Sequence, residues 1–319
     1  MRPIAEAYKD FPILHKEHNG HRVIYLDSGA TAQIPQSVID RVVEHMTQRN
    51  GNPHRGSHIL AIEASEDYEN ARDRVVEFIN AREREEVVFT RNSTESMNLI
   101  AHSYGLHNVK KGDKIVITVA EHHANLVTWQ YVAEQTGATL EYMYLDEHGH
   151  LKDGEINKID EKTKIVAFAH VSNVLGMEFP VKELTEKAHS VGAIVVLDGA
   201  QSTPHKKIDV QALDCDFFVF SGHKMCASQG IGVLYGKREL LEVMPPFLLG
   251  GDMIEYVKEQ TATFNELPYK FEAGTPNADG AVSLHAAIDY LESFGMDAIE
   301  AYEEELVAYI LPKLLELPH

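Results

Sequence analysis

The sequence predicts an α/β protein of three layers, with a mostly parallel, doubly wound sheet between two layers of helices. Short, continuously apolar segments alternate with longer segments in which apolar residues recur at helical spacing. The short segments are apolar on both faces, which is typical of strands that helices cover on both sides. A chain of 319 residues with 44% hydrophobic residues can bury the core that such a fold needs, in one large domain or in two.

The expected elements follow in chain order from this alternation. The predicted helices in the first part of the chain cover residues 36–46, 66–79, 93–105, 123–135 and 181–192. The predicted strands cover residues 86–90, 113–120, 138–145, 163–171, 193–198 and 216–222. A further apolar run, residues 231–235, follows the last strand almost at once, and from residue 281 onward the pattern is purely helical.

We divide the chain into a large domain, residues 20–294, and two flanking segments, residues 1–19 and 295–319. The second flanking segment is helical and coincides with the end of the sequence. We therefore expect it to be the start of a small C-terminal domain that is truncated here.

Composition and charge argue against several classes of function. A formal net charge of −20 disfavours nucleic acid or an anionic membrane surface as the main partner. The first residues lack the apolar core of a signal peptide, and no apolar run is long enough to span a bilayer. The two cysteines, Cys215 and Cys226, are too few and wrongly spaced for a disulfide framework or a CxxC site. We therefore expect a cytoplasmic protein.

Polar and ionisable side chains follow the carboxyl ends of several predicted strands. Ligands bind at these ends in an open parallel sheet. In chain order the side chains are Thr94, His122, Asn173, Asp198, Gln201, Ser221, His223 and Lys224. Because the carboxyl ends of parallel strands meet at one edge of the sheet, we expect these side chains to surround one ligand.

Each of these residues also has a purely structural explanation. Thr94 stands where a hydroxyl ordinarily caps a helix, although the free N–H groups of such a helix end also bind phosphate. A lone histidine such as His122 is more often a satisfied structural residue, and a lone Lys224 would be solvated. The pair His122–His123 lacks a second ligand cluster at metal-binding spacing, so we expect no metal site. It is the conjunction of these residues that indicates a functional site.

A lysine, an aspartate, a histidine and a phosphate-binding helix end together match the chemistry of pyridoxal 5′-phosphate. The amine of Lys224 can form a Schiff base with the aldehyde of the cofactor. Asp198 can face the pyridine nitrogen and raise its pKa, because an opposite charge stabilises the protonated ring. A protonated ring is the better electron sink for a carbanion at the substrate's Cα.

The remaining residues suit the other parts of this cofactor. His122 can stack on the ring, and Asn173 or Gln201 can hydrogen-bond to its phenolic oxygen. The phosphate would be held by Thr94, Ser221 and His223.

Other ligands fit less well, because residues 230–236 do not match GxGxxG and the sequence contains neither a GxxxxGK[ST] loop nor a GxSxG elbow.

Several sequence blocks, in this order, resemble the SUF-type (class II) cysteine desulfurases, which are fold-type I pyridoxal phosphate enzymes of the class V aminotransferase group. The blocks are YLDSGATAQIP, NPHRGSH, VFTRNSTESMNLIA, AEHHANLVTWQ, AHVSNVLG, VLDGAQSTPH, DFFVFSGHKM and KFEAGTPN. The resemblance implies the roles given above, with Lys224, His122 and Asp198 catalytic. It adds Thr275, which would reach the phosphate bound by the other subunit of a homodimer.

The reaction that the resemblance implies is the removal of sulfur from L-cysteine. The products would be L-alanine and an enzyme-bound persulfide for iron–sulfur cluster assembly, and the partner would be a sulfur-acceptor protein of the SUF type. Two alternatives stay open at this point. One is a selenocysteine lyase or another class V aminotransferase-like lyase, and the other is a truncated pyridoxal phosphate-binding protein without catalytic activity.

The second alternative rests on two departures from the family pattern. The attacking cysteine and the arginine that binds the substrate carboxylate lie in a C-terminal domain of the family that this sequence does not reach. Cys215 and Cys226 are poorly placed substitutes, because one precedes a core strand and the other follows the lysine closely. After Lys224 the chain has Ala227-Ser228-Gln229 in place of a Gly-Pro-Thr run, which could change the turn that presents the lysine.

Overall fold

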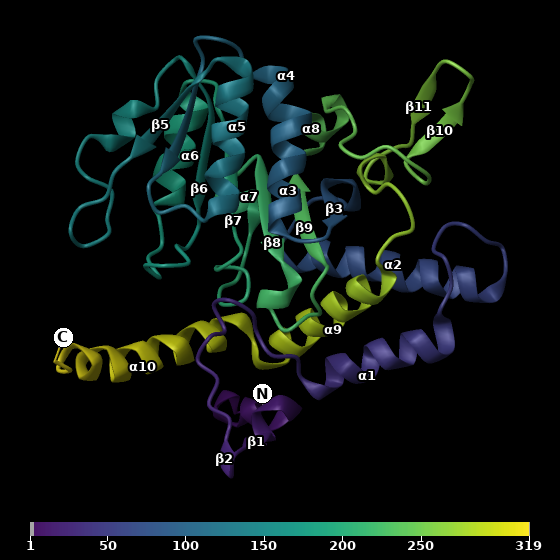
Figure 1. The fold of residues 1–319 in the computed structure, drawn as a ribbon, viewed down its shortest axis with the longest axis vertical. Coiled ribbons are helices and arrows are strands. Elements are labelled where there is room, and N and C mark those ends of the chain that lie inside the picture. Colours follow the sequence, from purple (N-terminus) through teal and green to yellow (C-terminus); the bar gives the residue numbers. More distant parts are fainter. Residues whose placement is uncertain (1–2, 319) are drawn as a thin grey trace.

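The computed structural model describes residues 3–318, and its centre is a seven-stranded sheet (Figure 1). The neighbouring strands are, in spatial order, β3 (Val87–Thr90), β9 (Gly232–Gly236), β8 (Phe217–Ser221), β7 (Ile194–Asp198), β6 (Thr163–Ala169), β4 (Lys114–Thr118) and β5 (Thr139–Met143). Neighbouring strands pair in parallel except where β9 pairs with β3 and with β8. The other strands share one direction, so the prediction of a mostly parallel sheet is confirmed.

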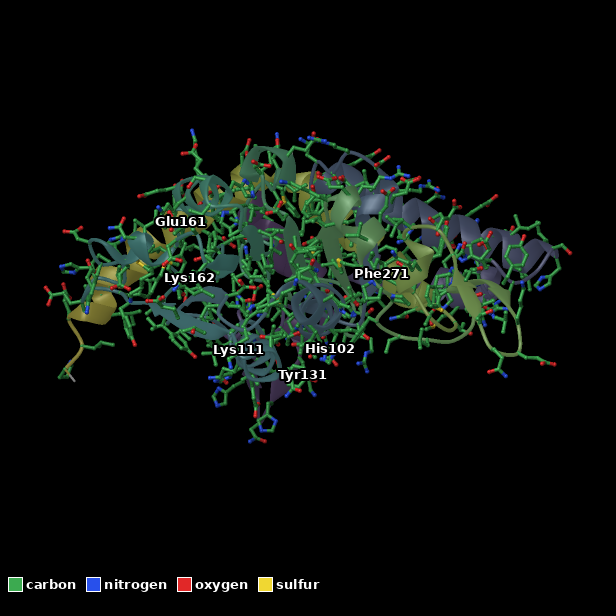
Figure 2. All side chains as sticks on the ribbon, turned by 90° about the horizontal axis from the view of Figure 1, so that it is seen from above. His102, Lys111, Tyr131, Glu161, Lys162 and Phe271 are labelled. Atoms are coloured by element: carbon green, nitrogen blue, oxygen red, sulfur yellow. The ribbon has the colours of Figure 1, made fainter. Side chains whose placement is uncertain are left out.

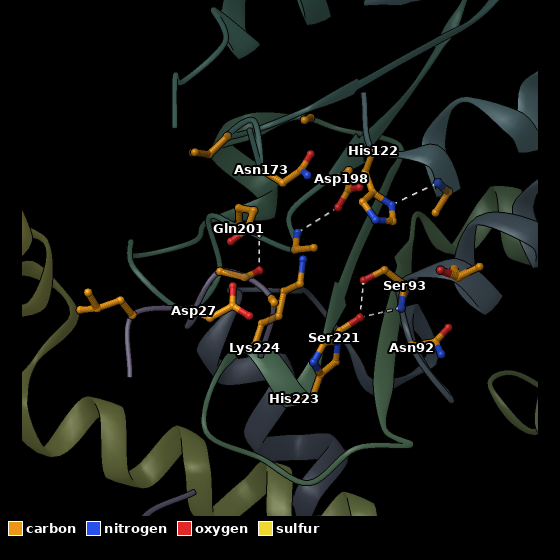
Figure 3. Close-up of a pocket in the computed structure, with 18 residues that line it drawn as sticks. Asp27, Asn92, Ser93, His122, Asn173, Asp198, Gln201, Ser221, His223 and Lys224 are labelled. Atoms are coloured by element: carbon orange, nitrogen blue, oxygen red, sulfur yellow. Dashed lines mark hydrogen bonds between the residues drawn. The ribbon is translucent and has the colours of Figure 1, made fainter. Parts of the chain in front are cut away.

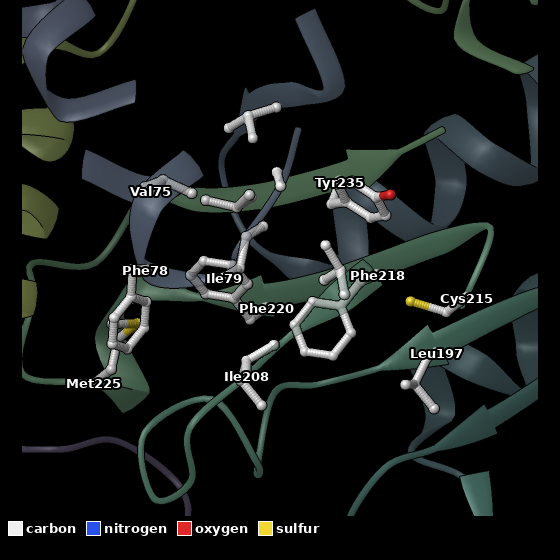
Figure 4. Close-up of a cluster of buried hydrophobic side chains, with 14 of the residues drawn as sticks. Val75, Phe78, Ile79, Leu197, Ile208, Cys215, Phe218, Phe220, Met225 and Tyr235 are labelled. Carbon is white, nitrogen blue, oxygen red and sulfur yellow. The ribbon is translucent and has the colours of Figure 1, made fainter. Parts of the chain in front are cut away.

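Side chains of the strands alternate between two buried clusters, one on each face of the sheet. On β8, Phe218 and Phe220 belong to the first cluster, whereas Phe217 and Val219 belong to the second. All four are fully buried, and each buried side chain of this size stabilises the fold by about 1.5–3 kcal/mol. Figure 4 shows part of the first cluster, with Phe218 and Phe220 among side chains from α2 and β9. This burial on both faces explains why the strands read as continuous apolar runs.

Helices cover both faces of the sheet and complete the three predicted layers. The first face is covered by α2 (Ile59–Phe78), α6 (Val181–Ser190), α7 (Val210–Leu213) and α9 (Ala278–Phe294), and α1 (Gln36–Glu44) packs on α9. The second face is covered by α3 (Ser93–Ile100), the π-helical η5 (Ala101–Gly105), α4 (Leu106–Asn108), α5 (Val127–Thr136) and α8 (Arg238–Val243). On this face His102 of η5 and Tyr131 of α5 lie side by side, with ring centroids 5.2 Å apart (Figure 2).

The remaining elements lie outside these layers. Two short hairpins are formed by β1 (Glu17–His18) with β2 (His21–Arg22) and by β10 (Ile254–Val257) with β11 (Ala262–Phe264). Short 3-10 or π-helical segments are η1 (Ile4–Asp10), η2 (Pro12–His15), the π-helical η3 (His45–Arg49), η4 (Arg84–Glu86), η6 (His123–Asn125), η7 (Glu155–Lys158), η8 (Gly222–Lys224) and η9 (Tyr269–Phe271). The last helix, α10 (Met296–Leu315), extends away from the sheet and is largely exposed (Figure 1).

The predicted helices differ most from those observed at two places. α2 begins at Ile59 rather than at residue 66. The side chain of His58 caps this earlier start, because it accepts a hydrogen bond from the N–H of Ala61. The predicted helix 93–105 is α-helical only to Ile100 and continues as the π-helical η5. Such irregular turns leave the hydrophobic spacing almost unchanged, so a pattern of apolar residues cannot detect them.

The expected domain boundary at residue 294 coincides with the end of α9. Gly295 follows, with a φ of 89° that separates α9 from α10. The division into a large domain and the start of a smaller one stays a prediction. Within residues 3–318, no helix has the length and apolar character needed to cross a bilayer.

Candidate active site

A cavity of about 640 Å³ opens at the edge of the sheet where the parallel strands end (Figure 3). Each predicted site residue except Thr275 lines it. These residues come from the segments that follow β3, β4, β6, β7 and β8, so they meet only because these strands share one direction. Parallel topology thus brings residues that are distant in the sequence to one site.

Lys224 and Asp198 reach the cavity from neighbouring strands. Asp198 is the last residue of β7 and is 6% exposed, whereas Lys224 ends η8, directly after β8, and is half-buried. Burial raises the pKa of Asp198 and lowers the pKa of Lys224, and each of the two charges partly opposes the effect of burial on the other. Figure 3 shows the Lys224 amine pointing toward Asp198. A desolvated acid beside a desolvated amine in a cavity is typical of an active site.

His122 presents a neutral imidazole to the same cavity. It is the N-cap of η6, and its Nδ1 accepts a hydrogen bond from the N–H of Ala124 at 3.1 Å. Because Nδ1 is an acceptor, the proton of the neutral ring is on Nε2. Partial burial lowers the pKa of His122; the negative charge of Asp198 opposes this effect, and the positive charge of Lys224 adds to it, so the pKa stays below its ordinary value. The ring is therefore held in one orientation and is uncharged at neutral pH.

A buried carboxyl group fixes the turn that carries His122. Glu121 receives hydrogen bonds from the hydroxyl of Thr118 at 2.5 Å and from the side-chain amide of Asn125 at 2.6 Å. The carbonyl of that amide in turn accepts from the indole N–H of Trp129 at 2.8 Å. Burial raises the pKa of Glu121 to about 8. The sequence analysis did not select Glu121, because nothing in its local pattern distinguishes it from a solvated glutamate.

The N-terminus of α3 supplies backbone donors on another side of the cavity. Asn92 caps this helix, and its side-chain oxygen accepts from the N–H of Glu95 at 3.0 Å. The N–H of Ser93 donates to the Ser221 hydroxyl at 2.9 Å, and the two hydroxyl oxygens are 2.7 Å apart. Among residues 3–318 the N–H of Thr94 has no acceptor. The positive end of the helix and this free donor suit an anion.

The structure adds a wall of the cavity that the sequence analysis did not assign. Leu26, Asp27, Gly29 and Ala30, from the loop before α1, line the cavity. The side-chain amide of Gln201 donates to the carbonyl of Gly29 at 2.9 Å, which anchors this loop to the segment after β7. The loop lies within the block YLDSGATAQIP that carried the family resemblance, but nothing local to the block indicates its long-range contacts.

Thr275 lies outside this cavity. It is exposed and belongs to a separate pocket beside Phe271, Glu272 and Ala273. Its predicted contact with the phosphate of a second subunit stays a prediction.

The segment after Lys224 is held by a serine pair. The N–H of Ser228 donates to the Ser283 hydroxyl at 2.8 Å, and the N–H of Ala227 donates to the carbonyl of Gly222 at 3.1 Å. The residues Ala227 and Ser228 thus form an ordered turn onto α9, in place of the Gly-Pro-Thr turn of the family pattern.

The residues of the cavity fit pyridoxal phosphate. The nearly buried carboxylate of Asp198 has one protein donor within the described chain, the N–H of Ala200 at 2.9 Å, which leaves it an oxygen for a protonated ring nitrogen. The amine of Lys224 has no hydrogen-bond or ion-pair partner among these residues, and the N–H of Thr94 is likewise free. Three groups of the right chemistry, each with an unused donor or acceptor, therefore face one cavity of suitable size.

The fold and this donor set together define a pyridoxal phosphate-dependent enzyme built on a doubly wound sheet. The model of the class V aminotransferase family matches residues 24–319. The chain belongs to this family and, by its relatives, to the cysteine desulfurases within it.

Curated relatives and solved structures agree on this assignment. A probable cysteine desulfurase from Halalkalibacterium halodurans is 53% identical over 98% of this chain and 77% of the relative. The cysteine desulfurase CsdA from Escherichia coli is 38% identical and superposes with a TM-score of 0.91 over 100% of this chain and 79% of its own. A cysteine desulfurase from Thermococcus onnurineus NA1, solved in its apo form, is 41% identical with a TM-score of 0.93, over 100% of this chain and 78% of its own. These names do not favour the alternative of a selenocysteine lyase.

Proposed function

We propose that this protein is a SUF-type cysteine desulfurase that removes sulfur from L-cysteine and releases L-alanine. The observation that carries the proposal is that Lys224 and the nearly buried Asp198 reach one cavity from neighbouring strands, together with the N–H of Thr94 at the N-terminus of α3, which has no acceptor within residues 3–318. The relatives named cysteine desulfurase support this choice of reaction.

When bound, pyridoxal phosphate supplies an electron sink for the carbanion that forms at the substrate's Cα. Lys224 would hold the cofactor through its amine. Because burial lowers the pKa of this amine, a larger fraction of it is neutral and able to take the Cα proton of the substrate. Lys224 thus serves first as the anchor and then as the base.

Asp198 and His122 would orient the ring from two directions. The carboxylate of Asp198, held by the N–H of Ala200, would accept a hydrogen bond from the ring nitrogen and keep it protonated. The fixed, neutral imidazole of His122 offers a flat face for stacking. The ring oxygen would contact Asn173 or Gln201.

The phosphate would bind at the N-terminus of α3. Thr94 offers a free backbone N–H, and the hydroxyl of Ser221 and the ring of His223 line the same part of the cavity. In a homodimer, Thr275 of one subunit would complete the phosphate site of the other. We further propose that the enzyme acts in the cytoplasm and passes its sulfur to an acceptor protein of the SUF type for iron–sulfur cluster assembly.

The test is a visible absorbance spectrum of the purified protein with added pyridoxal phosphate, followed by L-cysteine. We expect an absorption band that is lost in the variant Lys224→Ala and that shifts when L-cysteine is added, and we expect alanine as the product when a thiol such as dithiothreitol is also present. A matched control is Lys182→Ala, an exposed lysine on α6. A protein that shows no band with pyridoxal phosphate would refute the proposal.

A further inference from the structure

A threonine outside the predicted site contacts the cavity residue His223. The hydroxyl oxygen of Thr31, in the loop before α1, lies 3.1 Å from Nδ1 of His223 and 3.1 Å from the carbonyl oxygen of the same residue. The backbone N–H of Ala32 donates to that carbonyl at 2.8 Å. Two consecutive loop residues thus hold His223 at the end of β8.

The single proton of the Thr31 hydroxyl allows two arrangements. In the first, it goes to the carbonyl of His223, and the oxygen accepts a hydrogen bond from a protonated Nδ1. In the second, it goes to an unprotonated Nδ1, and the imidazole proton is then on Nε2. The carbonyl does not need Thr31 as a donor, because it already accepts from Ala32.

The position of the His223 ring favours the second arrangement. The ring lines the cavity, and Nε2 has no partner within residues 3–318, so Nε2 is the nitrogen left for a ligand. Burial and the charge of Lys224 lower the pKa of His223, so the ring is neutral at neutral pH and carries one N–H. In the first arrangement a bare lone pair on Nε2 would face the phosphate, which is repulsive. In the second, Nε2–H donates to it.

We propose that Thr31 is a positioning residue whose hydroxyl donates to Nδ1 of His223 and thereby keeps the Nε2–H tautomer directed at the phosphate of the cofactor. This inference rests on the proposed function, because it assumes that the anion in this cavity is the phosphate of pyridoxal phosphate. The same loop is anchored a second time through Gly29 and Gln201, so the loss of the Thr31 hydroxyl alone should leave it in place.

The first test is a titration of the apo-protein with pyridoxal phosphate, followed by absorbance. Thr31→Val keeps the shape of the side chain but removes the hydroxyl, and we expect the Kd to rise roughly 3- to 10-fold, as for the loss of one hydrogen bond. Thr31→Ser should restore the affinity to within about 2-fold of the wild type. Thr47→Val, which removes an exposed hydroxyl at η3, is the matched control and should have no effect.

The second test is NMR of the imidazole nitrogens in isotope-labelled wild-type protein, which reports the tautomer directly. We expect His223 to be neutral with its proton on Nε2, and to lose this fixed tautomer in Thr31→Val. A proton on Nδ1, an imidazolium at neutral pH, or an unchanged Kd in Thr31→Val would overturn the inference. The proposed function would survive each of these results, because it fails only if the wild-type protein binds no pyridoxal phosphate.

Discussion

At the scale of single residues, the site depends on charged groups whose burial costs free energy. Asp198 is almost fully buried at the end of a core strand, and the charge of Lys224 and the N–H of Ala200 only partly offset that cost. A buried carboxylate is retained where a cationic partner stabilises it. The protonated ring nitrogen of the cofactor would be that partner.

Replacing Asp198 with asparagine tests this role. Asp198→Asn keeps the shape and an acceptor for the N–H of Ala200, but it removes the negative charge. We expect the cofactor to stay bound while alanine formation falls roughly 10- to 1000-fold, because the ring nitrogen loses about 1–3 pKa units of stabilisation. Asp214→Asn, an exposed carboxylate before β8, is the control, and an equal loss in both variants would contradict the assignment.

The buried Glu121 makes stability depend on pH. Its pKa is raised to about 8 in the folded protein from an ordinary 4.5, so the folded state binds this proton more tightly than the unfolded chain. Its contribution to stability is therefore complete below about pH 4.5 and is lost as the pH rises through about 8. Glu121→Gln removes this titration.

Urea unfolding at about pH 6 and about pH 8 measures the effect. Between these values the wild type should lose roughly 2 kcal/mol more of its unfolding free energy than Glu121→Gln. Glu239→Gln, an exposed glutamate on α8, should follow the wild type. If Glu121→Gln loses as much stability between these pH values as the wild type, the pH dependence comes from a group other than Glu121.

Much of the site could be predicted at this scale, and the reason is physical. Lys224, Asp198 and His122 stand directly after apolar strands, where a polar residue is conspicuous in the sequence. Glu121 and Thr31 are not conspicuous in this way. Thr31 contacts a residue 192 positions away in the sequence, and only the folded chain brings the two together.

At the scale of elements, a buried ion pair joins α2 to the segment that carries Thr275. The guanidinium of Arg72 is fully buried and makes two hydrogen bonds to Glu272, at 2.7 Å and 2.9 Å. The same carboxylate accepts from the N–H of Phe89 on β3 at 2.7 Å and from the hydroxyl of Tyr68 at 2.8 Å. One glutamate thus ties a helix, an edge strand and a loop together.

Removal of this glutamate should destabilise the protein strongly. Glu272→Ala leaves the guanidinium of Arg72 buried without its main partner, and we expect a loss of about 3 kcal/mol in unfolding free energy. Glu242→Ala removes the exposed partner of Arg238 on α8 and should cost less than about 0.5 kcal/mol. Chemical denaturation of the two variants makes the comparison, and similar losses would show that the buried pair adds nothing beyond a surface contact.

The elements themselves follow from the sequence where their periodicity is clear. The predicted strand 193–198 is observed as β7 (Ile194–Asp198), because burial on both faces demands a continuous apolar run. The start of α2 was predicted too late, because Ile59, Leu60 and Ile62 are exposed and hide its amphipathic pattern. The extent of a helix depends on caps and tertiary contacts that periodicity does not record.

At the scale of the whole molecule, the directions of the strands determine at which edge of the sheet the site lies. Because β9 alone runs against its neighbours, β3 and β8 end at the same edge, and the N-terminus of α3 lies beside the end of β8. The alternation of strands and helices predicted this edge. Neither the loop before α1 nor the turn that carries Glu121 could be placed there without the folded structure.

The two cysteines of this chain are poorly suited to the sulfur-transfer step of the reaction. Sulfur transfer needs a thiolate, but both Cys215 and Cys226 are buried, and burial raises their pKa values, that of Cys226 to about 12. A thiol in this state is a poor nucleophile. The sulfur of L-cysteine must therefore pass to a thiol other than these two.

We expect alanine formation by this 319-residue chain to depend on an added thiol such as dithiothreitol. The C–S bond of the substrate breaks, an S–S bond to the added thiol forms, and the thiol's proton balances the new C–H bond of alanine. The rate should rise with thiol concentration, and the double variant Cys215→Ala/Cys226→Ala should behave like the wild type if it folds. Alanine formed without added thiol, together with a persulfide found by mass spectrometry on Cys215 or Cys226, would show that the cavity opens to one of these buried residues during turnover.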